Sequence, residues 1–148
     1  MSRADAITAF ANRLKTIPRV GNVWSDIGNP VSEVDKKDRF LVDGRYRAWE
    51  VTCEGSQGAD KEAAATARTY TVVAYGYFSF QSGSTEADVQ ALCAAVEAEF
   101  DQMDKRTFDG RFDSSEPIQV DGPKLVPYAG IVVHGVIVTC LITEYPIY

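Results

Sequence analysis

The amino-acid sequence predicts an α+β fold in one domain spanning residues 1–148, with a mainly antiparallel β-sheet and two α-helices packed on one face. Three observations carry this prediction. Two segments have the apolar spacing of amphipathic helices, several segments rich in Val, Thr, Tyr and Ile have strand composition, and 148 residues suffice for one core. The expected order of elements is α, β, β, loop, β, α, β, β, without an internal repeat.

The first expected helix covers Ala4–Lys15. Its apolar residues lie on one stripe, Ser2 is placed to cap it, and Pro18 disfavours helical geometry in the residue before it. The stripe consists of Ile7, Phe10, Ala11 and Leu14.

A β-hairpin is expected around Asp43-Gly44, because an Asp-Gly pair supplies the positive φ angles of a tight turn. Its arms are Phe40–Val42 and Tyr46–Cys53. In the second arm, alternation places one set of side chains toward the core, namely Arg47, Trp49, Val51 and Cys53.

The next segment, Glu54–Arg68, is expected to be an exposed flexible loop, with Ala59–Ala67 either loop or marginal helix. Arg68–Phe80 then has the composition of a strand and is apolar on both faces, which is typical of a central strand. Two helices offer little material to cover both faces of a sheet. We therefore expect a neighbouring subunit to bury the second face.

The second helix begins after a cap at Ser84 or Thr85 and runs to about Asp104. Asp121–Pro123 is then expected to be the turn of a second hairpin, between Pro117–Val120 and Leu125–Val126. Ile131–Tyr145 is expected to be a long closing strand. The stripe of the second helix consists of Val89, Leu92, Cys93, Val96, Phe100 and Met103.

The net charge of −6 disfavours general attraction to nucleic acid. A basic cluster is interrupted by acidic residues and favours a solvated face over a nucleic-acid contact. No disulfide framework is expected from three widely spaced cysteines, and no apolar stretch predicts an export signal or a membrane span. The basic cluster is Lys36, Lys37, Arg39, Arg45 and Arg47.

We find no motif for catalysis, a cofactor or a metal, and expect a protein that is not an enzyme. His134, the only histidine, lies in a strand pattern and is expected to be structural. Lys105–Glu116 imitates a calcium loop but places Lys105 and Thr107 where carboxylates are required. The aromatic residues of Tyr70–Phe80 favour a core or interface over a nucleic-acid stacking platform, since no basic residues are interleaved.

Four segments together resemble tail terminator proteins of tailed bacteriophages: Ala6–Leu14, Thr69–Tyr77, Thr85–Phe100 and Val133–Glu144. The resemblance implies a late structural protein of the virion neck, assembled in the host cytoplasm. Its copies form a ring, commonly a hexamer, that caps the tail tube and joins it to head-completion or connector proteins. DNA passes through the lumen without specific binding, and an acidic chain suits that passage.

Two segments are candidates for the partner interface, the Glu54–Arg68 segment and the C-terminal Tyr145–Tyr148, because exposed segments commonly order on binding. A head-tail joining or stopper protein of the same neck is an alternative function. A small-molecule-binding or enzymatic α+β domain is another, given the aromatic strand and scattered carboxylates. The candidate interface residues are Gln57, Lys61, Glu62, Arg68, Tyr145, Ile147 and Tyr148.

Overall fold

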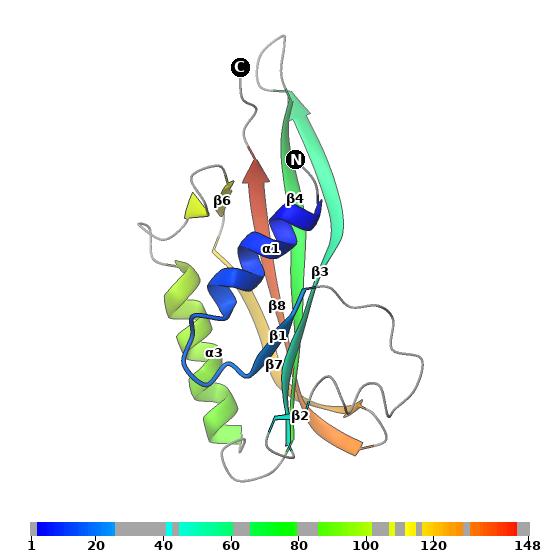
Figure 1. The fold of residues 1–148 in the computed structure, drawn as a ribbon, viewed down its shortest axis with the longest axis vertical. Coiled ribbons are helices and arrows are strands. Elements are labelled where there is room, and N and C mark those ends of the chain that lie inside the picture. The colour runs from blue at the N-terminus through cyan, green and yellow to red at the C-terminus, as the bar shows by residue number, and fades with distance from the viewer. Residues whose placement is uncertain are drawn as a thin grey trace.

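A sheet of long strands carries both helices on one side (Figure 1). The structure is a computed structural model that describes residues 3–25, 41–42, 45–60, 66–79, 86–101, 107–108, 112–114, 117–128 and 131–144. The helices are α1 (Arg3–Leu14) and α3 (Glu86–Asp101). The strands are β1 (Asn22–Trp24), β2 (Leu41–Val42), β3 (Arg45–Asp60), β4 (Thr66–Phe78), β5 (Thr107–Phe108), β6 (Phe112–Ser114), β7 (Gln119–Tyr128) and β8 (Ile131–Glu144).

The strand order is β1-β3-β4-β8-β6-β5, with β2 also paired to β3 and β7 also paired to β8. Among the described strands, only the pair β1–β3 is parallel. The strand β4 lies between β3 and β8, so the predicted central strand is confirmed. The predicted α+β class, a mainly antiparallel sheet with two helices, is confirmed as well.

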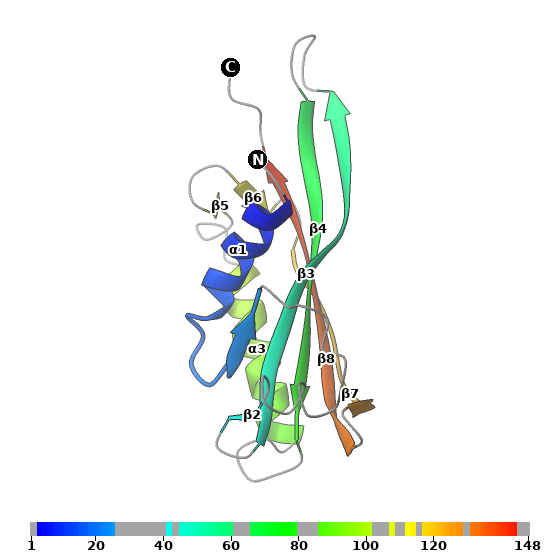
Figure 2. The same cartoon turned by 45° about the vertical axis from the view of Figure 1, so that its right-hand side comes forward.

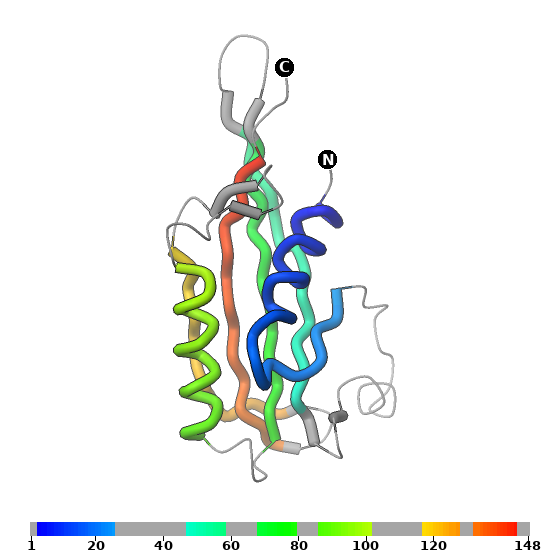
Figure 3. The backbone as a smooth tube through the Cα atoms, turned by 60° about the vertical axis from the view of Figure 1, so that its left-hand side comes forward, coloured from blue at the N-terminus to red at the C-terminus, as the bar shows by residue number. Residues whose placement is uncertain are grey.

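Both helices lie on the same face of the sheet (Figure 3). The Phe10 ring of α1 stacks on the Phe100 ring of α3, with the ring centroids 4.8 Å apart. The sheet presents Trp49 and Val51 of β3 to this core, as the alternation predicted, while Cys53 is half-buried. Neither helix that the structure describes is long and apolar enough to cross a membrane.

The expectation of a loop or helix over Glu54–Ala67 is wrong for the residues that the structure describes there. The strand β3 continues to Asp60 and β4 begins at Thr66, with a register shift between Cys53 and Gly55. This hairpin extends past the other strands of the sheet (Figure 1). The ladder between the two strands satisfies the backbone groups, which outweighs the loop tendency of Gly55, Ser56 and Gly58.

The expected hairpin at Asp121–Pro123 is also wrong, because β7 runs through these residues and pairs with β8 on both sides of them. The ladder only shifts register between Asp121 and Lys124, so the Gly122-Pro123 pair is a bulge rather than a turn. The Asp43-Gly44 hairpin is supported by the pairs Leu41↔Tyr46 and Val42↔Arg45. Within the imitated calcium loop, β5 and β6 form an antiparallel pair.

Several expectations fall outside the described residues. These are the Ser2 and Ser84 or Thr85 caps, Asp43-Gly44 itself, Met103 at the end of the second helix, and the basic residues Lys36, Lys37 and Arg39.

Candidate functional site

The face of the sheet turned away from the helices is the candidate functional site. Side chains alternate along each strand, so residues paired across neighbouring strands share a face. Glu50, Tyr75, Ile137 and Asp121 form one row across β3, β4, β8 and β7. We call the surface carrying this row and the neighbouring Tyr77 the open face. In the described part of the chain, neither helix lies over it (Figure 2).

A groove with a volume of about 220 Å³ lies on the open face between β4, β8 and β7. Apolar groups dominate its walls, and two charged side chains belong to its lining, Asp121 and Lys124. The lining residues are Tyr75–Tyr77, Asp121, Lys124, Val126, Pro127 and Gly135–Ile137.

Two glycines, Gly122 and Gly135, allow β7 and β8 to approach closely beside the groove. A Cβ atom at Gly135 would lie 2.6 Å from Cγ2 of Val126, closer than such atoms approach. Gly122 has a φ of +111°, and a Cβ there would lie 2.6 Å from the carbonyl oxygen of Gly135. Side chains at these two positions would therefore push β7 away from β8.

The open face carries its own small apolar cluster. Ala48 of β3 and Val133 of β8 are fully buried there, with Trp24, Tyr77 and Val126 packed against them. Ile137, in contrast, keeps 40% of its surface exposed beside the groove. The site thus combines a rigid apolar floor with an accessible branched side chain.

Two tyrosines of β4 supply hydroxyl groups to the open face. The Tyr75 hydroxyl donates a hydrogen bond to Oε1 of Glu54, and this bond is the main reason that the pKa of Tyr75 rises to about 12. Burial, followed by the charge of Glu50, raises the pKa of Tyr77 to about 12. Both phenols are therefore neutral at ordinary pH and act as hydrogen-bonding groups rather than as phenolate nucleophiles.

Acidic residues outnumber basic ones around the groove. Glu50 and Glu54 come from β3 and Asp121 from β7, while Lys124 brings the opposing charge. The Asp121 carboxylate accepts a hydrogen bond of 3.2 Å from Nε2 of Gln119. Among the described residues, the open face is thus a negatively charged surface around an apolar groove.

The residue types usual in catalysis lie elsewhere. His134 is buried and pairs across the sheet with Phe78, on the side of the helices. Cys93 and Cys140 are buried, and burial, followed by Glu97, raises the pKa of the Cys93 thiol to about 11. In the portions of the chain that the structure describes, no three His, Cys, Asp or Glu side chains gather as metal ligands.

The candidate interface residues Gln57 and Arg68 lie together on the extended β3–β4 hairpin and are exposed. Nη1 of Arg68 donates a hydrogen bond of 3.1 Å to Oγ of Ser56. Thr69, the cross-strand partner of Gln57, is six residues from Tyr75, or roughly 20 Å along the strand. The hairpin and the groove are therefore separate surfaces. Lys61, Glu62, Tyr145, Ile147 and Tyr148 lie outside the described residues.

Sequence reasoning indicated that two helices would leave one face of the sheet uncovered. It missed the groove on that face, because it assigned Asp121–Pro123 to a turn. The available signal was Gly135, a glycine inside a strand of branched residues, which often marks a close backbone approach. Comparison of the chain with models of known protein families and with curated proteins gives no match.

Proposed function

We propose that this chain is a structural virion protein whose copies form a ring, a hexamer in the expected form, at the end of a bacteriophage tail tube. The ring joins the tube to the head-completion or connector proteins. The sequence resemblance to tail terminator proteins motivates this proposal. The observation that carries it is the open face, where the groove and the exposed Ile137 offer a surface for another protein.

The chemistry of the open face favours a protein partner over a small ligand. A groove of about 220 Å³ is smaller than the roughly 300–1,000 Å³ of typical ligand pockets. Aromatic residues around an apolar centre, with charged residues at the rim, are typical of protein interfaces. Tyr75, Tyr77 and Ile137 supply that centre, and Asp121 and Lys124 belong to the rim.

The extended β3–β4 hairpin supports a second contact in the same proposal. It reaches beyond the end of β8, since the last β4–β8 pair is Arg68↔Glu144 while the β3–β4 pairs continue to Asp60↔Thr66. An arm of this kind suits contact with an adjacent ring, either the tube or the connector. Gln57 and Arg68 are the exposed candidates on it.

Two other functions remain alternatives. A head-tail joining or stopper protein of the same neck would use the same two surfaces one ring nearer the capsid. A small-molecule-binding domain would use the groove itself, and the pair of neutral tyrosine hydroxyls is the feature that favours it.

The test combines light scattering during size-exclusion chromatography with binding to purified tail tubes. Six copies of the 16.2 kDa chain give a ring of about 97 kDa. We expect a ring, formed either in free solution or on the tube, and density at the tube end in electron micrographs. Binding to capsid connectors without binding to tubes would move the assignment to the neighbouring ring. Binding to neither would contradict the neck assignment.

A further inference from the structure

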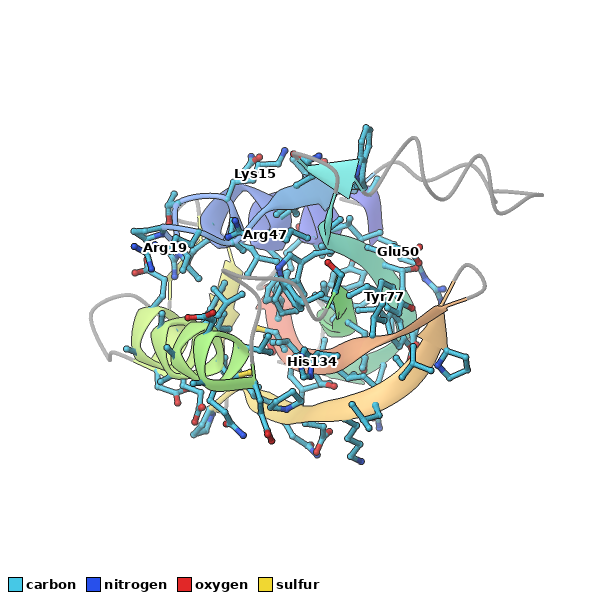
Figure 4. All side chains as sticks on the ribbon, turned by 90° about the horizontal axis from the view of Figure 1, so that it is seen from below. Lys15, Arg19, Arg47, Glu50, Tyr77 and His134 are labelled. Atoms are coloured by element: carbon cyan, nitrogen blue, oxygen red, sulfur yellow. The ribbon has the colours of Figure 1, made fainter. Side chains whose placement is uncertain are left out.

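A basic corner lies on the opposite side of the sheet from the groove. We use this name for Lys15 directly after α1, Arg19 in the turn that follows, and Arg47 near the start of β3. Figure 4 shows these three residues on the side of the helices, while Glu50 and Tyr77 lie on the other side of the sheet. Arg19, Arg47 and the carboxylate-bearing Asp88 line a pocket of about 140 Å³ there. The corner is a local cationic surface in a chain of net charge −6.

The turn that carries the corner is held rigidly. Nη2 of Arg47 donates a hydrogen bond of 2.7 Å to the carbonyl oxygen of Arg19. Nε1 of the buried Trp49 donates one of 2.9 Å to the carbonyl oxygen of Val20, and the Val20 amide bonds the Ile17 carbonyl at 3.2 Å. A surface fixed in this way loses little conformational freedom when it docks, so more of its contact energy appears as affinity.

Arg19 has a φ of +65°, a conformation that is strained for any residue with a side chain. Two residues later the backbone again has a positive φ, +90°, and there the chain uses a glycine, Gly21. A Cβ at that position would also have no room beside Arg47. At position 19 the chain instead keeps a long cationic side chain in an exposed place. Strain retained at an exposed residue points to a function for that side chain.

We propose that the basic corner of one copy docks on the open-face groove of a second copy of this chain. The charges are complementary, since Glu50, Glu54 and Asp121 give the receiving face its negative balance. Pro18, exposed between the cations, and the accessible Ile137 supply apolar contact. The two surfaces lie on opposite faces of one sheet, so the contact is head-to-tail, and repetition of such a contact closes a ring or continues as a filament.

This inference rests on the proposed function, because it names the contact between neighbouring subunits. The first test is the variant Arg19→Gly, which removes the cation and relieves the strained backbone. We expect its unfolding midpoint in urea to equal or exceed that of the wild type, while self-association measured by sedimentation velocity weakens about tenfold or more. Arg3→Gly is the matched control, since it removes an exposed cation from the first turn of α1.

A charge exchange supplies the second test. Arg19→Asp and Asp121→Arg should each weaken association, and the double variant should restore it. Wild-type association should fall between about 0.1 M and about 1 M salt, where the screening length shortens from about 10 Å to about 3 Å. Restoration in the double variant would support the inference.

Two outcomes would overturn it. One is association of Arg19→Gly equal to that of the wild type, which leaves the ring and the neck assignment intact but places the contact elsewhere. The other is a wild-type chain that remains monomeric both alone and on tail tubes. Tube binding is scored separately, so loss of this contact and loss of the neck assignment are distinguishable.

Discussion

Gly135 of β8 and Val126 of β7 are diagonal neighbours in the β7–β8 ladder, and they lie so close that only the absence of a side chain at Gly135 leaves room for Val126. The nearest approach of a Cβ built on Gly135 is 2.6 Å to Cγ2 of Val126, with Cγ1 at 3.1 Å. Both residues line the groove of the open face. Val126 can therefore pack against the backbone of β8 only because position 135 is a glycine.

The substitution Gly135→Ala should lower the free energy of unfolding by about 1–3 kcal/mol, because the added methyl group overpacks the ribbon. Urea denaturation followed by circular dichroism measures the change. Gly55→Ala is the control, since nothing lies within 4 Å of a Cβ there. We expect its stability to stay within about 0.5 kcal/mol of the wild type. Equal losses in the two variants would mean that the close approach to Val126 is not the cause.

The stacked pair Phe10–Phe100 joins α1 to α3 in the centre of the core. Both rings are almost fully buried. The substitution Phe10→Ala should therefore cost about 3–5 kcal/mol of stability, through lost apolar burial and the cavity that remains. Ile7→Ala, at a half-buried position of the same helix, should cost clearly less. Thermal and urea unfolding of the two variants side by side decide this point.

The helices and the central strands were predictable because their apolar periodicity is strong and each faces the core directly. Trp49 and Val51 in β3, and Val89 and Phe100 in α3, are buried as the spacing predicted. The extension of β3 past Cys53 was not predictable. Its residues Gly55, Ser56 and Gly58 are typical of loops, and only pairing with β4 determines its conformation.

The site was harder to predict than the fold because it depends on register and backbone angles. Gly122-Pro123 has the composition of a turn, yet the ladder with β8 continues on both sides of it. The contact of Gly135 with Val126 requires knowledge of that register. The basic corner depends on the left-handed conformation of Arg19, for which the sequence carries no signal.

Stability should decline in alkaline solution through the tyrosines of the open face. The pKa of Tyr75 is raised from 10.0 to about 12 mainly by its hydrogen bond to Glu54, and that of Tyr77 to about 12 mainly by burial. Above about pH 10 the unfolded state releases these two phenol protons while the folded state still holds them, which favours unfolding. The stability contributed by the two protonated tyrosines is therefore complete below about pH 10 and is lost toward pH 12. Urea unfolding of the wild type between these pH values measures the loss.

Two variants separate the causes of this pH dependence. Glu54→Ala removes the acceptor, so the pKa of Tyr75 should fall toward its ordinary value while that of Tyr77 remains high. Ultraviolet titration of the phenols, with Tyr75→Phe and Tyr77→Phe to assign the transitions, reads both values. An unchanged titration of Tyr75 in Glu54→Ala would contradict the role of the hydrogen bond.

The exposed Ile137 offers the most direct test of the open face as an interface. A lysine at this position projects a charge beside the groove, and burying that charge against a partner carries a large desolvation cost. We expect Ile137→Lys to weaken self-association or tube binding by about tenfold or more. Its stability should remain within about 0.5 kcal/mol of the wild type, because the residue is 40% exposed.

Val132→Lys is the matched control for this variant. Val132 lies on the same strand and is 51% exposed, but alternation along β8 directs it to the opposite face from Ile137. Sedimentation velocity and tube-binding assays then measure how much one added charge weakens association when it lies on the open face and when it lies on the opposite face. Loss confined to Ile137→Lys supports the open face as the contact surface. Equal loss in both would indicate a general effect of charge, and loss confined to Val132→Lys would move the contact to the side of the helices.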